Sequence, residues 1–202
     1  MTAPLSDWTA RGRRLQYFTI AYNSAEAAIS LAAGILAGSV SLIGFGLDSI
    51  IEVTSGAAML WRLRDATAER ITLRIVGWCF LLLAAYIALD SASMLYRHEE
   101  AQHSLPGILV ATASVIVMPL LARAKRQVAQ HLGSAALNAD SRQADFCGYL
   151  SAILLAGLLL NAVFGWWWAD PAAALIMTPI IAKEGYDALK GKQCSDCGCA
   201  LH

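Results

Sequence analysis

Two acidic residues lie four positions apart in a long apolar stretch of the sequence. Asp48 and Glu52 would share one face of a helix, because four residues turn an α-helix by about 400° and advance it by about 6 Å. Unprotonated carboxylates at this spacing repel each other, so one takes up a proton unless a cation lies between them. Oxygen ligands on one helical face, completed from a neighbouring helix, suit a divalent metal ion. The alternative is a pair buried for packing or bonded to Arg142.

A later apolar segment offers a partner for this acid pair. Asn138, Ser141 and Asp145 fall on one stripe of a helix, because offsets of four and seven residues return to nearly the same face. We expect His131 to continue this stripe one heptad earlier. Asp140 lies about 140° around the helix from Asp145, so it does not easily join the same site. Asp145 is therefore the expected third acidic ligand.

The first apolar segment carries a polar stripe of its own. Thr19, Asn23, Glu26 and Ser30 recur at spacings of four, three and four residues. Such a stripe could line a hydrated path, in which Glu26 relays protons or takes part in metal access. Asn23 and Ser30 are better explained by hydrogen bonds between helices, whereas both interpretations of Glu26 stay open.

The composition of the chain indicates a membrane protein. Hydrophobic residues make up 57% of the 202 residues and charged residues only 15%, whereas soluble domains carry about 25% charged residues. This excludes a disordered chain and an enzyme with an ordinary water-covered surface. Fifteen basic and fifteen acidic residues balance, so nothing indicates a nucleic-acid partner.

Six stretches of the sequence are long enough to cross a bilayer, whose hydrocarbon core requires about 20 apolar helical residues. We therefore predict an all-α membrane protein with six transmembrane helices in residues 15–189. Residues 1–14 form an N-terminal segment and residues 190–202 a Cys-rich tail. The helices are expected at about residues 15–37, 41–63, 71–96, 105–121, 134–164 and 170–189.

Lysine and arginine residues predict the orientation of these helices. Thirteen of the fifteen fall on the side of the two termini, Arg97 falls on the other side and Arg142 inside a span. Cytoplasmic segments carry the excess of Lys and Arg, so both termini are expected in the cytoplasm. No eukaryotic targeting feature is evident, and the expected location is a bacterial inner (plasma) membrane.

Three segments of the sequence resemble the membrane domain of the cation diffusion facilitator family. Together they place the resemblance over about residues 15 to 190, in the order and number of spans of that family. Each motif is loose alone, but three in register are specific. They are Ser-Leu-Ile-Gly-Phe-Gly-Leu-Asp-Ser-Ile-Ile-Glu at 41–52, Ala-Asp-Ser-Arg-Gln-Ala-Asp at 139–145 and Trp-Ala-Asp-Pro-Ala-Ala-Ala-Leu at 168–175.

The resemblance implies a homodimer that exports a divalent metal ion in exchange for protons. By position, Asp48, Glu52 and Asp145 match metal ligands of the family, but Ser141 stands where a His or Asp is typical. A neutral hydroxyl is a poor zinc ligand. Asp140 could replace it through a distorted helix, water could complete the shell, or the site could select another ion. Zn²⁺ is the first candidate because it prevails in the family; carboxylates without His favour Mn²⁺, and Cd²⁺, Co²⁺ and Fe²⁺ are further alternatives.

The C-terminal tail differs from most members of the family, which carry a cytoplasmic domain after the sixth helix. Only thirteen residues follow Leu189, so we expect any dimer to form through the membrane domain. The tail could hold a tetrahedral Zn²⁺ site or capture Cu(I); the alternative is an unstructured, reduced tail. Its candidate ligands are Cys194, Cys197, Cys199 and His202.

Two further cysteines, Cys79 and Cys147, are single residues in apolar stretches. We interpret both as small packing groups rather than as ligands.

The resemblance and the acid pair together predict transport by alternating access. Metal would enter past the face of His131 and Asn138 and bind Asp48, Glu52 and Asp145 near the bilayer midplane. A metal-binding membrane regulator that does not transport is the alternative. An intramembrane enzyme is a weaker one, because the sequence has no nucleophile elbow, phosphate loop or zinc-protease motif. We therefore expect no enzymatic activity and no organic cofactor.

Overall fold

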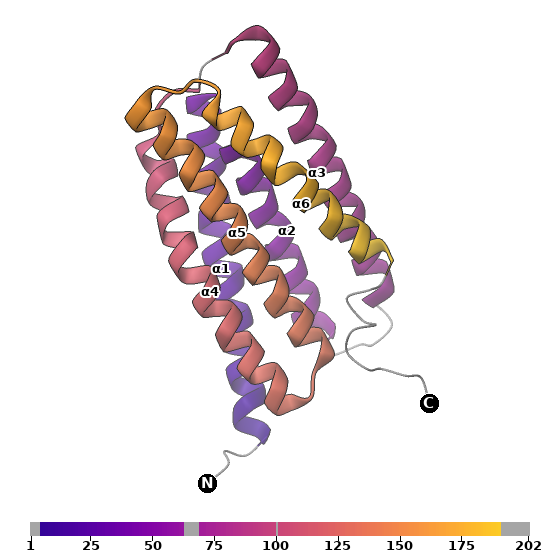
Figure 1. Cartoon of the computed structure of the whole chain (residues 1–202). Helices are drawn as coiled ribbons and strands as arrows, with labels where there is room; N and C mark the ends of the chain where they lie inside the picture. Colours follow the sequence, from indigo (N-terminus) through magenta and orange to yellow (C-terminus); the bar gives the residue numbers. More distant parts are fainter. Residues whose placement is uncertain (1–4, 63–68, 100, 191–202) are drawn as a thin grey trace.

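The computed structural model describes residues 5–62, 69–99 and 101–190, and these residues form six α-helices that run side by side (Figure 1). The all-α class and the six predicted helices are confirmed. The helices are α1 (Leu5–Ala37), α2 (Val40–Arg62), α3 (Glu69–Arg97), α4 (Leu105–Leu132), α5 (Ala135–Phe164) and α6 (Ala169–Leu189).

Two helices are longer than predicted. α1 begins ten residues before the predicted start and α4 ends eleven residues beyond the predicted end. A predicted span includes only the apolar residues that cross the membrane. The helices α1 and α4 continue beyond these residues into polar helical turns, and α1 packs against α4 in this polar region. Trp8 of α1 stacks on His131 of α4 with 3.8 Å between ring centroids, and Val128, Ala129 and Leu137 form a small separate core beside them.

A glycine and a serine determine where α4 ends and α5 begins. Gly133 ends α4 in the left-handed conformation (φ 60°) and donates to the carbonyl groups of Ala129 and Gln130. Glycine adopts this conformation without the steric cost of a Cβ atom. The Ser134 side chain then accepts from the backbone N–H of Leu137 and caps α5.

Five helices in the described part of the chain contain stretches long and apolar enough to cross a membrane. α6 is not one of them, because four charged residues occur among its 21 residues. It packs against α2, α3 and α5. The five stretches are Asp7–Ala37, Val40–Ala57, Gly77–Arg97, Leu105–Leu132 and Asp140–Phe164.

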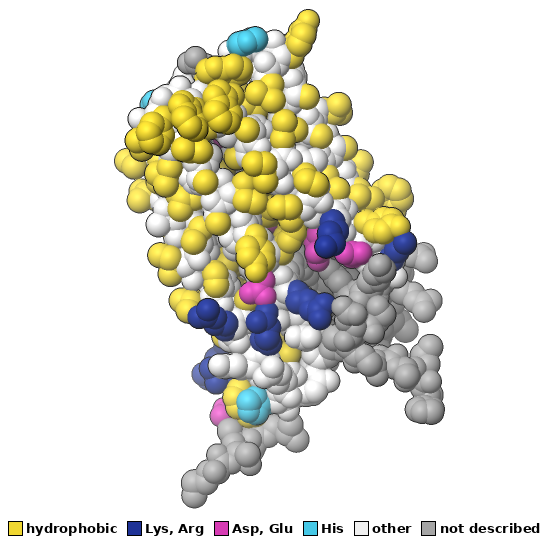
Figure 2. All heavy atoms as spheres, viewed as in Figure 1, with side chains coloured by type: hydrophobic (Ala, Val, Ile, Leu, Met, Phe, Trp, Pro, Cys, Tyr) yellow, Lys and Arg dark blue, Asp and Glu magenta, His cyan; other side chains and the backbone are white. Residues whose placement is uncertain are grey.

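The outside of the bundle is apolar over most of its length. Leu36 is 81% exposed and Leu89 74%, and Figure 2 shows hydrophobic side chains covering the visible face except near one end. Lys and Arg gather towards the end where α1 begins and α6 ends (Figures 1 and 2). An apolar surface of this extent is not stable in water and fits contact with lipid.

The helix that carries the acid pair occupies the middle of the bundle. α2 contacts α1, α3, α5 and α6, while α4 closes the bundle by packing on α1 and α5. Side chains on α2 are therefore surrounded by other helices on most sides, which is the position required for a site buried inside the protein.

The start of α2 is held by a carboxylate from α6. Asp170 accepts hydrogen bonds from Ser39 Oγ (2.6 Å), from the backbone N–H of Val40 (3.0 Å) and from the Ser41 hydroxyl. Ser39 in turn caps α2 by accepting from the N–H of Leu42 (3.2 Å). A negative charge at a helix N-terminus is also favoured by the helix dipole. Asp170 thus fixes where α2 begins relative to α6.

We predict that Asp170→Ala lowers the thermal midpoint of unfolding in detergent. The substitution leaves two hydroxyls and one N–H without their acceptor, and each unpaired buried donor costs about 1–3 kcal/mol. Glu99→Ala is the matched control, because Glu99 pairs with Arg97 at 3.7 Å in an exposed position and such pairs contribute about 0–1 kcal/mol. Equal midpoints for the two variants would contradict the prediction.

Candidate metal centre

The acid pair of α2 lies inside the bundle. Asp48 is 3% exposed and Glu52 1%. Neither carboxylate oxygen of Glu52 accepts a hydrogen bond from the described residues. A buried carboxylate without donors is costly, so the pair is incomplete without a positive charge or a proton.

Four helices bring charged or polarisable groups towards the pair. Asp48 interacts with Glu52, and also with Glu26 of α1, the Cys147 thiol of α5 and Glu184 of α6. Glu52 interacts with the same thiol and with an ion pair between α4 and α5. Four helices therefore surround one group of acidic side chains.

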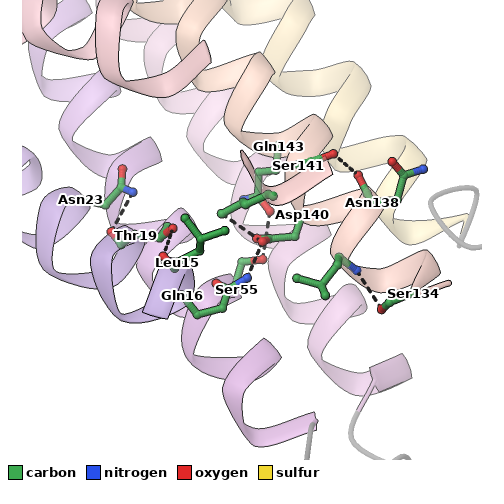
Figure 3. Close-up of polar contacts among 12 residues, drawn as sticks. Leu15, Gln16, Thr19, Asn23, Ser55, Ser134, Asn138, Asp140, Ser141 and Gln143 are labelled. Carbon is green, nitrogen blue, oxygen red and sulfur yellow. Dashed lines mark hydrogen bonds and ion pairs between the residues drawn. The ribbon is translucent and has the colours of Figure 1, made fainter. Parts of the chain in front are cut away.

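The ion pair beside Glu52 is fully buried. Lys125 of α4 is 0% exposed, and its Nζ lies 3.0 Å from Oδ2 of Asp140 on α5. The same oxygen accepts from Nε2 of Gln16 on α1 at 2.5 Å, and the two side chains point towards each other in Figure 3. Lys125 is the basic residue buried next to Glu52, whereas Arg142, which we considered as its partner, is exposed.

The charges of this cluster favour a divalent cation. When all groups are ionised, Glu26, Asp48, Glu52 and Asp140 carry four negative charges and Lys125 offsets one of them. The remaining three would be balanced by one divalent cation together with one proton, or by three protons. Charges buried in a low-dielectric interior require such compensation.

The two other predicted ligands bind partners of their own. Asp145 forms an ion pair with Arg126 of α4, and both side chains are at least one third exposed. The hydroxyl of Ser141 donates to the backbone carbonyl of Asn138 at 2.7 Å. Among the residues that the structure describes, no three His, Cys, Asp or Glu side chains are grouped closely enough to hold a metal ion. Glu52 thus interacts with Asp48 and with Asp140, whereas Asp145 and Ser141 bind other groups.

The angular positions of residues around α5 explain why Asp145 lies away from the acid pair. Cys147 and Asp145 are two residues apart on α5, so their side chains point about 160° apart around the helix. Asp140 precedes Cys147 by seven residues and shares its inward face. One orientation of α5 can present Cys147 or Asp145 to the acid pair, but not both.

The predicted access residues are divided between α1, α4 and α5. The polar stripe of α1 faces the interior: Glu26 is 3% exposed and accepts from Ser49 Oγ at 3.0 Å. Asn23 is fully buried and donates to the carbonyl of Thr19. Asn138 lies in the first turn of α5 and Figure 3 places it beside Ser141.

The prediction that His131 continues the stripe of α5 is wrong. Gly133 ends α4 before α5 begins, so His131 belongs to the last turn of α4. Its ring stacks on Trp8, and its Nδ1 lies 2.8 Å from the carbonyl oxygen of Gln127.

The predicted site in the tail cannot be placed. Its four candidate ligands, Cys194, Cys197, Cys199 and His202, lie outside the described residues.

The burial of Lys125 was not predicted from the sequence, although the sequence contains a pattern that indicates it. The sequence alone places Lys125 among the basic residues that follow the fourth predicted span, on the side of the two termini. However, it falls on the buried side of α4 together with Met118, Leu121, Ala122 and Val128, at the spacings of three and four residues that mark one helical face. Extending the predicted helix to 132 would have placed this lysine inside the bundle.

We predict that Lys125→Met destabilises the protein strongly. Removing one partner of a buried ion pair costs about 3–5 kcal/mol, and replacing both partners in Lys125→Met/Asp140→Leu should recover part of this loss, because no buried charge is then left unpaired. Thermal unfolding in detergent measures both. Arg126→Met is the matched control, since its partly exposed pair contributes about 1 kcal/mol or less. The single variant Asp140→Leu completes the set, and a double variant whose loss equals the losses of Lys125→Met and Asp140→Leu added together would contradict the prediction.

Comparisons with known proteins identify the family of the chain. Residues 17–191 match the cation efflux transmembrane domain. The chain is also 25% identical over 113 residues to the cation-efflux pump FieF of Shewanella oneidensis. The aligned part covers 56% of this chain but 36% of that relative, so the chain spans little more than a third of its length. The chain therefore belongs to the cation efflux transmembrane domain family and is an integral, multi-pass membrane protein.

Proposed function

We propose that this chain carries a divalent metal cation across the membrane in exchange for protons, with Asp48 and Glu52 as its first ligands. The observation that carries the proposal is the unpaired carboxylate of Glu52, which is 1% exposed and accepts no hydrogen bond from the described residues. Protons and a divalent cation are the two ways to neutralise the pair, and ligands must lose their protons to bind metal. Competition between the two couples metal release to proton uptake.

The positions of the Lys and Arg residues indicate from which side of the membrane the metal would enter. Lys and Arg gather towards the end of the bundle where α1 begins and α6 ends (Figures 1 and 2), and the positive end of a membrane protein faces the cytoplasm. We infer that metal enters from this end, in a bacterial inner membrane. The buried hydroxyls of Ser114 and Ser151, hydrogen-bonded at 2.9 Å, continue the polar interior beyond Cys147 towards the opposite end, together with Glu26.

Transport by alternating access would give Asp145 and Ser141 a role in another state of the protein. Asp145 and Ser141 reach the acid pair only if α5 turns and Asp145 leaves Arg126. We propose that Asp145 joins the site in another state of the transport cycle, with Ser141, Asp140 or water completing the shell. Zn²⁺ is the first candidate cargo, and Mn²⁺, Cd²⁺, Co²⁺ and Fe²⁺ are the alternatives. A homodimer through the membrane domain is part of the proposal, because the family resemblance implies it.

Metal flux into proteoliposomes with an imposed pH gradient tests the function. We expect flux that depends on the gradient and falls by about a hundredfold or more in Asp48→Asn and Glu52→Gln, since even loss of groups that only orient metal ligands costs 10–100-fold. Asp145→Asn should lower flux as well. Glu99→Gln, a surface carboxylate, should leave it unchanged.

Two results would contradict the proposal. Flux that is insensitive to Asp48→Asn and Glu52→Gln would place transport elsewhere in the molecule. Metal binding without flux, in protein reconstituted in both orientations, would indicate a metal-binding regulator instead.

A further inference from the structure

A cluster of polar side chains joins four helices inside the bundle. Oδ2 of Asp140 on α5 lies 3.0 Å from Nζ of Lys125 on α4 and accepts from Nε2 of Gln16 on α1 at 2.5 Å. Gln143 follows Asp140 by three residues, and its Oε1 accepts from the hydroxyl of Ser55 on α2 at 2.9 Å. Apart from Lys125, these side chains are seen close together in Figure 3. We call these five residues the inner cluster.

The inner cluster lies between the acid pair and the end of the bundle where Lys and Arg gather. Ser55 follows Glu52 by three residues on α2, which is less than one helical turn. The next residue, Gly56, packs on Gln16, because a Cβ atom at Gly56 would lie 3.4 Å from Oε1 of Gln16. From there α2 continues towards the basic end, where α1 begins (Figure 1). A cation that enters from the basic end therefore reaches the inner cluster before it reaches Glu52.

The inner cluster is buried, but its hydrogen bonds are incomplete. Lys125, Gln16, Asp140 and Gln143 are 0%, 1%, 7% and 8% exposed. Three of their atoms have no hydrogen-bond partner among the described residues, namely Oε1 of Gln16, Oδ1 of Asp140 and Nε2 of Gln143. Buried polar atoms are normally paired, and an unpaired one is costly. Separation of these side chains would let water reach the three atoms, which offsets part of the cost of breaking the contacts that are present.

We propose that the inner cluster is a gate on the metal path: it is closed in this structure, and its side chains separate when a cation enters from the basic end. The inference rests on the proposed function, because it concerns the route to the same carboxylates. A divalent cation at the level of the cluster is repelled by Lys125 and attracted by Asp140. Its entry therefore pulls the ion pair apart, and the pair re-forms once the cation has passed to Glu52.

The thiol of Cys147 can report whether the gate is open. Cys147 follows Asp140 by seven residues on α5, so it lies on the same face and about 10 Å further from the basic end. It is a free cysteine and is 1% exposed. A water-soluble thiol reagent that comes from the basic end must pass the inner cluster to reach it.

Labelling of Cys147 in membrane vesicles tests the gate without requiring transport. The parent is the full-length chain with its four other cysteines replaced by Ser, and the reagent is a membrane-impermeant methanethiosulfonate applied from one side at a time. From the side of the basic end, Gln16→Ala and Gln143→Ala should each raise the labelling rate by about tenfold or more, because each removes a buried hydrogen bond that holds the gate closed. From the opposite side, neither variant should change the rate.

Asn161→Ala is the matched control. Asn161 is also a buried amide, 4% exposed, but its Nδ2 donates to the carbonyl of Ala101 at 2.8 Å, at the opposite end of α5 from the inner cluster. This variant loses a comparable hydrogen bond and should leave labelling from the basic end unchanged.

The contrary outcomes separate this inference from the proposed function. If neither variant changes the labelling rate while metal flux depends on Asp48, the gate is overturned and the proposed function stands. If labelling rises equally from both sides, or equally in Asn161→Ala, the inner cluster only stabilises the fold and the gate is also overturned. If labelling rises as expected but the chain shows no metal flux, the proposed function fails, and the gate fails with it as a part of a metal path.

Discussion

Electrostatic repulsion between two buried carboxylates is the constraint on which the arrangement of charged groups inside this bundle depends. Asp48 and Glu52 lie one helical turn apart on the central helix α2, and Glu52 has no hydrogen-bond donor within the described residues. The nearest compensation is Lys125, whose charge is shared with Asp140. Such an arrangement is unfavourable for an empty protein, and it becomes favourable when a divalent cation or protons supply the missing charge.

The rest of the fold holds this cluster at a defined place. Asp170 of α6 fixes the start of α2, and through it the depth of the acid pair. The α4–α5 hairpin contributes Lys125, Asp140 and Cys147 from two adjacent helices. Because α5 carries Cys147 and Asp145 on nearly opposite sides, rotation of this one helix would turn the Asp145 carboxylate towards the acid pair. Such a rotation is the two-state movement that the proposed alternating access requires.

Much of the fold could be predicted from the sequence, because it depends on local patterns. Four of the six helices were predicted to within two residues of the observed bounds, since apolar length and glycine or serine at the ends determine them. The burial of Asp48 and Glu52 and of the stripe of α1 also followed from spacing. What the sequence did not determine was which helices face each other. Spacing cannot tell that Asp145 pairs with Arg126, or that Lys125 is buried and pairs with Asp140, because these contacts depend on how α4 and α5 rotate about their axes.

The most direct test of the central constraint is thermal unfolding of Asp48→Asn and wild type, each with and without Zn²⁺. An amide at position 48 removes the repulsion and can donate a hydrogen bond to the unpaired carboxylate of Glu52. We therefore expect the variant to unfold at a higher temperature than wild type without metal. Zn²⁺ should raise the midpoint of wild type, because a ligand that binds only the folded state stabilises it, and should leave the variant unchanged. A lower metal-free midpoint, combined with an undiminished response to Zn²⁺, would show that the acid pair is neither a source of repulsion nor the metal site.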